Sequence, residues 1–260
     1  MTITSGAFVL PPSPPPVSFY SHVVSVFKLV WVSLTSENPL VWSFVHGRAH
    51  PRADVSGPYY IVGALNVNFA LGKAVLGATQ DLKRSPLFLL SGKILGPSDE
   101  PVEATLDLWQ ADTSGVYSHA TYRNRGKATT DPTTGGFEIL TVPPREYGFS
   151  PSLMRAAHIH AIITAPRYQS LVTQLYVSPG NDPKPLDNDF INWMRSKRLG
   201  NMLSCWAIPT DKGDLFNHFP RLQDAEEESA KMVEEWNDRL QNEGLKVGCG
   251  ASTIIKLNKA

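Results

Sequence analysis

The sequence predicts a mainly β protein: an antiparallel β-sandwich core, a C-terminal amphipathic helix and an irregular or helical N-terminal extension. Two observations favour this fold. From Gly57 onward, short runs of β-branched and aromatic residues alternate with Gly-Pro, Ser-Asp and Thr-Gly-Gly turns, a pattern typical of sandwiches. Near the C-terminus, apolar residues recur at three- and four-residue steps instead, which indicates a helix. The 260 residues suffice for one domain with terminal extensions.

Five segments carry the strand pattern, and their alternation assigns faces. Successive side chains of a strand point to opposite sides, so Trp109 is expected to face away from Leu106 and Leu108. The predicted strands are Leu87 to Leu95, Ala104 to Ala111, Gly136 to Thr141, Ala157 to Thr164 and Leu171 to Val177.

The C-terminal segment predicts an amphipathic helix that packs on the sandwich through its apolar face. Gly244 is expected to end it, and Ser252 to Leu257 could add a last strand. The apolar residues at helical spacing, set among glutamates, are Leu222, Ala225, Met232, Val233, Trp236 and Leu240.

We expect three parts: an extension over residues 1–54, the sandwich over 55–220, and the helix with its last strand over 221–260. The extension is proline-rich and then apolar, and its sequence assigns it no chemistry. Val17 to Leu34 could pass for a membrane span, but His22, Lys28 and several serines interrupt it. No basic residue precedes it, as one would in a signal peptide. A packing helix is the expectation, and membrane association is not.

Charge and cysteine content narrow the classes of function. Lys+Arg and Asp+Glu both number 24, so no net charge attracts the chain to nucleic acid. The two cysteines, Cys205 and Cys249, lack the spacing of a C-x-x-C motif and are too few for a disulfide framework. A reducing, cytoplasmic location is therefore expected.

Chemistry is indicated by two histidines in one predicted strand. His158 and His160 project to the same side, with Ile159 pointing to the other, so two imidazoles could chelate one metal ion. Alone this pattern is equally common without metal. A cupin would place a glutamate a few residues later, and a structural zinc site would want cysteine or more histidine nearby. Neither follows here.

Two tyrosines stand upstream in turn-like settings. Tyr117 ends the run Thr-Ser-Gly-Val-Tyr, and Tyr147 follows Val-Pro-Pro-Arg-Glu. Either one alone is more often a packed aromatic than a ligand. In combination with the histidine pair and the motifs around them, they point to a known family.

These residues together resemble the intradiol ring-cleavage dioxygenases, the family of catechol 1,2-dioxygenase, hydroxyquinol 1,2-dioxygenase and protocatechuate 3,4-dioxygenase. The likeness runs from Gly57 to Val177. It rests on the Gly-Pro-Tyr-Tyr opening at 57–60, Leu-Trp-Gln-Ala-Asp at 108–112, Thr-Val-Pro-Pro at 141–144 and Thr-Gln-Leu-Tyr at 173–176. The resemblance implies that a non-haem Fe(III) ion is held by Tyr117, Tyr147, His158 and His160. It also implies that Arg155 and Gln174 line the substrate pocket.

The resemblance further implies the reaction. O2 and a catechol-type substrate would give a cis,cis-muconate-type diacid, with Tyr147 as the phenolate that leaves the metal and takes a substrate proton. Catechol or hydroxyquinol is favoured and protocatechuate comes next. A catechol-bearing secondary metabolite is a further alternative, and a homodimer is expected. Val55 and Ser56 stand where the family often has an acidic residue before the Gly-Pro pair.

Two other readings compete. The turn-rich strands also suit a non-catalytic transthyretin-like or carbohydrate-binding sandwich, but such a module has no need for the tyrosines and His-x-His. A ferrous extradiol or 2-His-1-carboxylate oxygenase needs a carboxylate ligand, and none stands at suitable spacing from His158 and His160.

Overall fold

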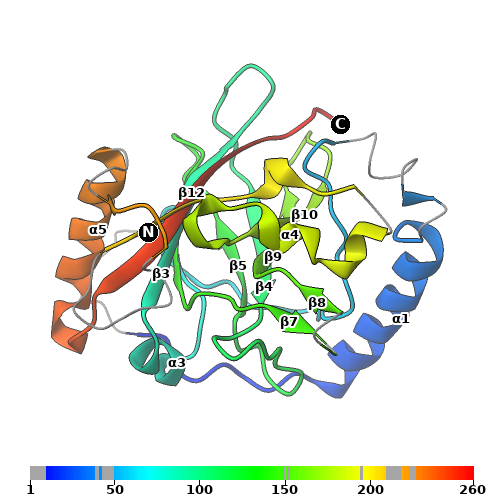
Figure 1. Ribbon diagram of the computed structural model, residues 1–260, viewed down its shortest axis with the longest axis horizontal. Helices are drawn as coiled ribbons and strands as arrows, with labels where there is room; N and C mark the ends of the chain where they lie inside the picture. Colours follow the sequence, from blue (N-terminus) through cyan, green and yellow to red (C-terminus); the bar gives the residue numbers. More distant parts are fainter. Residues whose placement is uncertain are drawn as a thin grey trace.

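A computed structural model of the chain describes residues 10–38, 41–42, 50–148, 150, 153–193, 196–208, 218–222 and 227–260. Its core consists of two sheets packed face to face, with one long helix at each end of the molecule (Figure 1). Within these ranges no helix has the length and apolarity needed to cross a membrane. The predicted β-sandwich is confirmed.

The larger sheet has six strands in the order β1-β2-β6-β3-β12-β11. Two of its pairings, β12 with β3 and β2 with β6, are parallel, which the antiparallel pattern read from the sequence did not foresee. The strands are β1 (Asn68–Ala70), β2 (Lys73–Val75), β3 (Leu87–Leu95), β6 (Gly136–Thr141), β11 (Ser204–Ala207) and β12 (Val247–Lys256).

The smaller sheet is antiparallel and has the order β10-β9-β4-β5. Three of its strands lie where the sequence predicts them, and β5 was not predicted. A separate two-stranded ribbon pairs Tyr147 with Arg155. The strands are β4 (Thr105–Gln110), β5 (Arg125–Thr129), β9 (His158–Thr164), β10 (Leu171–Tyr176), β7 (Tyr147–Gly148) and β8 (Met154–Arg155).

The main core lies between the two sheets. Phe88 and Ile94 of β3 and Ile255 of β12 meet Leu106 and Ile159 of the smaller sheet there. Burial of this apolar surface is the dominant favourable contribution to folding. Because alternate residues fill this core, the intervening side chains of β4, β9 and β10 face the other side of the smaller sheet.

Helix α5 (Glu227–Leu240) covers the outer face of the larger sheet, at the left of Figure 1. Val233, Trp236 and Leu240 pack on Leu89 and Leu140, as the apolar spacing predicts. The predicted position Ala225 lies outside the described residues. Gly244 takes a left-handed conformation with φ 65° just after the helix, and β12 begins five residues before the predicted last strand.

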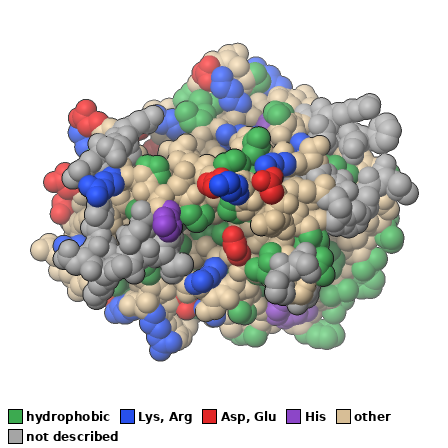
Figure 2. Space-filling view, in the orientation of Figure 1, with side chains coloured by type: hydrophobic (Ala, Val, Ile, Leu, Met, Phe, Trp, Pro, Cys, Tyr) green, Lys and Arg blue, Asp and Glu red, His purple; other side chains and the backbone are tan. Residues whose placement is uncertain are grey.

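Helix α1 (Phe19–Thr35) lies at the other end of the molecule, at the right of Figure 1. Ser18 caps it by accepting from the Ser21 amide. Hydrophobic side chains gather along this edge in Figure 2, among them Phe27, Trp31 and Leu34. The expected packing helix is therefore present, with one apolar side still exposed.

The other helices for which the structure gives both ends are short. They are α3 (Thr79–Arg84), α4 (Lys184–Asp187) and 3-10 turns at Pro179–Asn181, Phe190–Trp193, Leu199–Asn201 and Gln241–Glu243.

Candidate active site

The two predicted histidine ligands lie on the face of β9 that points away from the sandwich core. Ile159, between them, is buried in that core. His158 and His160 are both buried, and their ring centroids lie 4.5 Å apart. The strand alternation expected from the sequence therefore holds.

The two tyrosines reach the same place from other segments. Tyr117 comes from the loop between β4 and β5, and Tyr147 from β7. Their ring centroids are 5.1 Å apart. Tyr147 lies 5.6 Å from His158, and Tyr117 lies 6.1 Å from His160. The structure thus brings together all four residues that the sequence proposes as ligands.

The donor atoms of this cluster fit a metal ion. The Nε2 atoms of His158 and His160 are 3.0 Å apart, and two imidazoles bound at right angles with bonds of about 2.1 Å would also be about 3.0 Å apart. His158 Nδ1 lies 2.5 Å from the Ala156 carbonyl, which can only accept, so the proton sits on Nδ1 and Nε2 keeps its lone pair. The buried Tyr117 hydroxyl has no hydrogen-bond partner among the described residues.

The chemistry of the donors separates this site from the alternatives. No group of three His, Cys, Asp or Glu side chains placed to hold a metal is found in the described ranges. A carboxylate-completed facial triad or a cysteine-rich zinc site is accordingly not found in those ranges. The phenol rings of Tyr117 and Tyr147 pack against the imidazoles, and anionic oxygen donors favour hard metal ions.

Burial controls the protonation of these groups. It raises the pKa of Tyr117 well above its usual value and raises that of Tyr147 as well. Burial also lowers the pKa of His160 well below its usual value. Without a bound cation the site therefore holds neutral phenols and a neutral imidazole, and ligation by phenolate requires the metal itself to displace the protons.

Two buried guanidiniums oppose the effect of burial on the phenols. Arg155 favours the ionised form of both tyrosines, and Arg125 favours that of Tyr117. The Arg125 guanidinium carbon lies 6.0 Å from the Tyr117 ring centroid. Burial lowers the pKa of Arg125 to about 10, which leaves it charged at neutral pH. A guanidinium thus lies near each of the two tyrosines.

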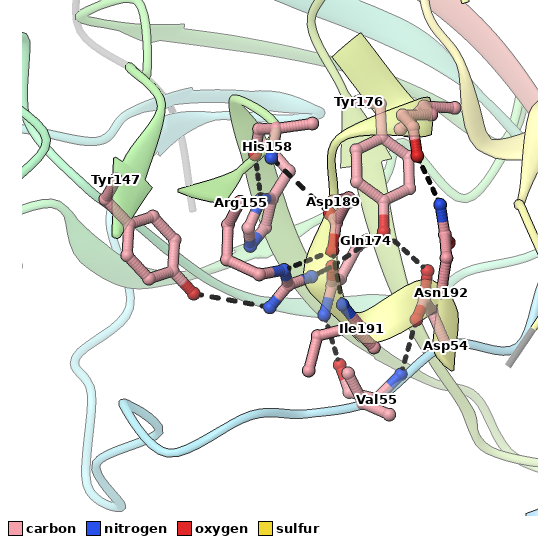
Figure 3. A network of polar contacts seen from close by, with 12 residues as sticks. Asp54, Val55, Tyr147, Arg155, His158, Gln174, Tyr176, Asp189, Ile191 and Asn192 are labelled. Carbon is pink, nitrogen blue, oxygen red and sulfur yellow. Dashed lines mark hydrogen bonds and ion pairs between the residues drawn. The ribbon is translucent and has the colours of Figure 1, made fainter. Parts of the chain in front are cut away.

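Arg155 is held by an ion pair inside the protein (Figure 3). Its Nε donates to Asp189 at 2.8 Å, and both side chains are at most 2% exposed. One terminal nitrogen lies 3.4 Å from the Tyr147 hydroxyl, and the other donates to Gln174 Oε1 at 2.5 Å. The Asp189 carboxylate also accepts from the amides of Ala156 and Ile191. Arg155 is therefore fixed beside Tyr147.

Gln174, opposite His160 in the sheet register, has a forced amide orientation. Its Oε1 accepts from Arg155 and from the Tyr176 hydroxyl, and its Nε2 donates to the Val55 carbonyl at 2.7 Å. Because arginine only donates and a carbonyl only accepts, the amide cannot be reversed. One N–H of Gln174 remains for another acceptor. The Tyr176 hydroxyl has a single proton, which lies between two acceptors, Gln174 Oε1 at 2.9 Å and Asp54 Oδ2 at 2.8 Å.

Sequence reasoning missed four residues that shape the site. Tyr59 stacks on Tyr117 at 4.4 Å, and Trp109 stacks on His160 at 4.6 Å. Arg125 and Asp189 supply the charges described above. The face assigned to Trp109 could have indicated its position, since it lies opposite His160 in the register of β4 and β9. Nothing in the local sequence singles out Asp189, which contacts a residue 34 positions away.

Comparisons with known proteins agree with this geometry. A family model described as Dioxygenase matches residues 55–211. The chain is 29% identical over 161 residues to catechol 1,2-dioxygenase of Acinetobacter baylyi, covering 54% of this chain and 49% of that protein. It is 29% identical over 178 residues to 6-chlorohydroxyquinol 1,2-dioxygenase of Cupriavidus pinatubonensis, covering 60% and 59%. It thus spans about half the length of these relatives.

Solved structures show the same fold at low sequence identity. Catechol 1,2-dioxygenase from Pseudomonas arvilla C-1 superposes with a TM-score of 0.58 at 20% identity, covering 93% of this chain and 69% of that one. Hydroxyquinol 1,2-dioxygenase from Pseudomonas putida DLL-E4 gives 0.58 at 19%, covering 93% and 83%. The family model matches more than half of the sequence, and the chain belongs to the intradiol ring-cleavage dioxygenases, a family that uses non-haem iron.

Proposed function

We propose that this protein is an intradiol dioxygenase that uses Fe(III) to insert both atoms of O2 into a catechol-type substrate and yields a cis,cis-muconate-type diacid. The observation that carries the proposal is that the buried Tyr117 phenol and the half-buried Tyr147 phenol meet two imidazoles whose Nε2 atoms are 3.0 Å apart. In this proposal Tyr117, Tyr147, His158 and His160 hold the metal. The ion would supply the electron-accepting centre that activates the catechol ring toward O2.

The two tyrosines have different duties in this proposal. Tyr147 leaves the metal and accepts a substrate proton at its phenol oxygen, a general-base role. The Arg155 guanidinium 3.4 Å away supports this role, because it stabilises the free phenolate until the proton arrives. Tyr117 is 6% exposed and stacked on Tyr59, so it has little freedom to move and stays bound.

Arg155 and Gln174 act on the substrate side of the site. Arg155 stabilises negative charge that develops on the ring, and its pairing with Asp189 keeps the guanidinium in place. Gln174 has one amide N–H left for an oxygen acceptor. Its Oε1 accepts from Arg155, so its main task in this scheme is to orient that guanidinium.

Catechol and hydroxyquinol are the favoured substrates, with protocatechuate next. Relatives named for catechol, chlorocatechol and hydroxyquinol support this class. A dioxygenase that tailors a catechol-bearing secondary metabolite is the alternative within the same chemistry. The homodimer and the cytoplasmic location expected from the sequence stay predictions, and sedimentation of the purified protein tests the first.

The test is reconstitution of the iron-free protein with ferric iron, followed by absorption spectroscopy and a substrate panel. We expect about one ferric ion per chain, a broad visible band from tyrosinate ligation, O2 uptake, and absorbance of a muconate-type product. A colourless protein that retains stoichiometric zinc and consumes no O2 with any of these catechols would contradict the proposal.

A further inference from the structure

The two histidines of the site are oriented by different means. Metal-binding histidines usually donate their second ring N–H to a carboxylate, a carbonyl or water, which fixes the ring. His158 does so through Nδ1 and the Ala156 carbonyl. His160 is fully buried, yet its Nδ1 has no hydrogen-bond partner in the described part of the chain. No hydrogen bond from the described residues fixes this ring at Nδ1, so its orientation depends on the groups packed around it.

Trp109 provides one side of that packing. Its ring is stacked on the His160 imidazole at 4.6 Å with an interplanar angle of 4°. The indole N–H is buried without a partner among the described residues, so Trp109 contributes its flat face and not a hydrogen bond. Tyr60 packs edge-on against Trp109 at 4.9 Å, and its hydroxyl donates to Asp107 at 2.9 Å.

Helix α1 contacts this stack from outside. The ammonium of Lys28 lies 4.0 Å from the centroid of the Tyr60 ring, a cation–π contact. The order from the helix to the metal ligand is therefore Lys28, Tyr60, Trp109 and His160.

The backbone of Gly57 lies close to another part of the His160 ring. Gly57 has φ +67°, and a Cβ added there would lie 3.4 Å from His160 Cε1. The segment is held by the carboxylate of Glu37, just beyond α1, which accepts from the amides of Ser56 and Gly57. Two separate contacts thus run from the α1 region to the same imidazole.

We infer that His160 is positioned by Trp109 and Gly57 in place of a hydrogen bond at Nδ1. In the N-terminal region, Glu37 holds the Gly57 segment, and Lys28 supports Trp109 through Tyr60. The N-terminal extension, which the sequence leaves without chemistry, is then a structural part of the metal site. This inference rests on the proposed function, because it concerns a ligand of the proposed iron.

The first experiment replaces the flat face of Trp109 in the full chain. Trp109→Phe keeps an aromatic face and should retain ferric affinity within about threefold. Trp109→Leu removes the face and should weaken ferric binding about 10- to 100-fold, the usual cost of losing an outer contact to a ligand. Chelator competition measures the affinity, and electron paramagnetic resonance of the bound ferric ion reports the geometry.

The matched control is Trp206→Leu. Trp206 is equally buried, also lacks a partner for its indole N–H among the described residues, and packs in the cluster with α5 on the far side of the sandwich. It should lower thermal stability without changing ferric affinity or the resonance spectrum. Equal losses of ferric affinity in Trp109→Phe and Trp109→Leu would overturn the stacking role, because the size of the cavity and not the flat face would then decide.

The second experiment tests Glu37. Glu37→Gln keeps the size and shape of the side chain. Its single oxygen can accept from one of the two backbone amides, and its NH2 group then faces the other amide. We expect weaker ferric binding and an altered resonance spectrum, while Glu228→Gln, in an exposed pair with Lys93, changes neither. Wild-type affinity and spectrum in Glu37→Gln would refute the role of the N-terminal region. If wild-type protein itself bound no ferric iron, the proposed function would fail first.

Discussion

Asp189→Asn is expected to cost about 3 kcal/mol of unfolding free energy and to loosen Arg155. The carboxylate is fully buried and pairs with a guanidinium that is 2% exposed. Removing one partner of a buried pair typically costs about 3 to 5 kcal/mol. The lower end applies here, because Asn Oδ1 can still accept from Arg155 Nε and from the Ile191 amide, both of which contact a single oxygen.

The assay is thermal and urea unfolding of the iron-free protein. At about 2 to 4 °C per kcal/mol for a domain near this size, the melting temperature should fall by roughly 6 to 12 °C. Asp187→Asn, two residues away, is the control. The Asp187 side chain is 58% exposed in its ion pair with Lys197, and such surface pairs contribute about 0 to 1 kcal/mol to stability. Equal, small shifts in both variants would show that Arg155 does not depend on Asp189.

Three further predictions concern the ligands. Tyr147→Phe should slow catechol chelation by about 10² to 10⁴ in anaerobic stopped-flow absorbance, whereas Tyr117→Phe should weaken the resting visible band; the reverse pattern would exchange their roles. Ile159→Val, in the core, should cost only about 0.5 to 1.5 kcal/mol and keep iron, whereas His160→Ala should lose iron, as metal analysis can check. Ferric affinity should rise with pH, by up to about 100-fold per unit if two phenol protons are released. Affinity that is independent of pH between 6 and 8 in chelator competition would contradict phenolate ligation.

The parts of the fold that the sequence predicts well are those where one periodicity persists. The bounds of Leu87–Leu95 and Gly136–Thr141 were predicted to the residue, because each segment is rich in residues that favour strands and is bounded by clear turn residues. Strand β5 was missed since Arg125, Gly126 and Lys127 show no hydrophobic alternation. Its pairing with β4 depends on backbone hydrogen bonds to residues 16 to 24 positions away. The parallel pairings of β12 and β2 are likewise invisible to local pattern.

The same distinction applies to the site: its residues could be predicted from the sequence where their neighbours are close along the chain. His158 and His160 were placed correctly because strand geometry alone puts both on one face. Tyr117 and Tyr147 were identified through the resemblance, since no spacing rule connects two loops to a strand.

Residues that act through distant contacts carry no local signal. Glu37 reaches Ser56 and Gly57 across 19 and 20 positions, and Asp189 reaches Arg155 across 34. Both are acidic residues of the kind that are solvent-exposed in most proteins. What distinguishes them is contact with specific donors, a property of the folded chain. Since an unsatisfied guanidinium or amide inside a protein is costly, each of these carboxylates is required by the donors it satisfies, and those donors become its neighbours only when the chain folds.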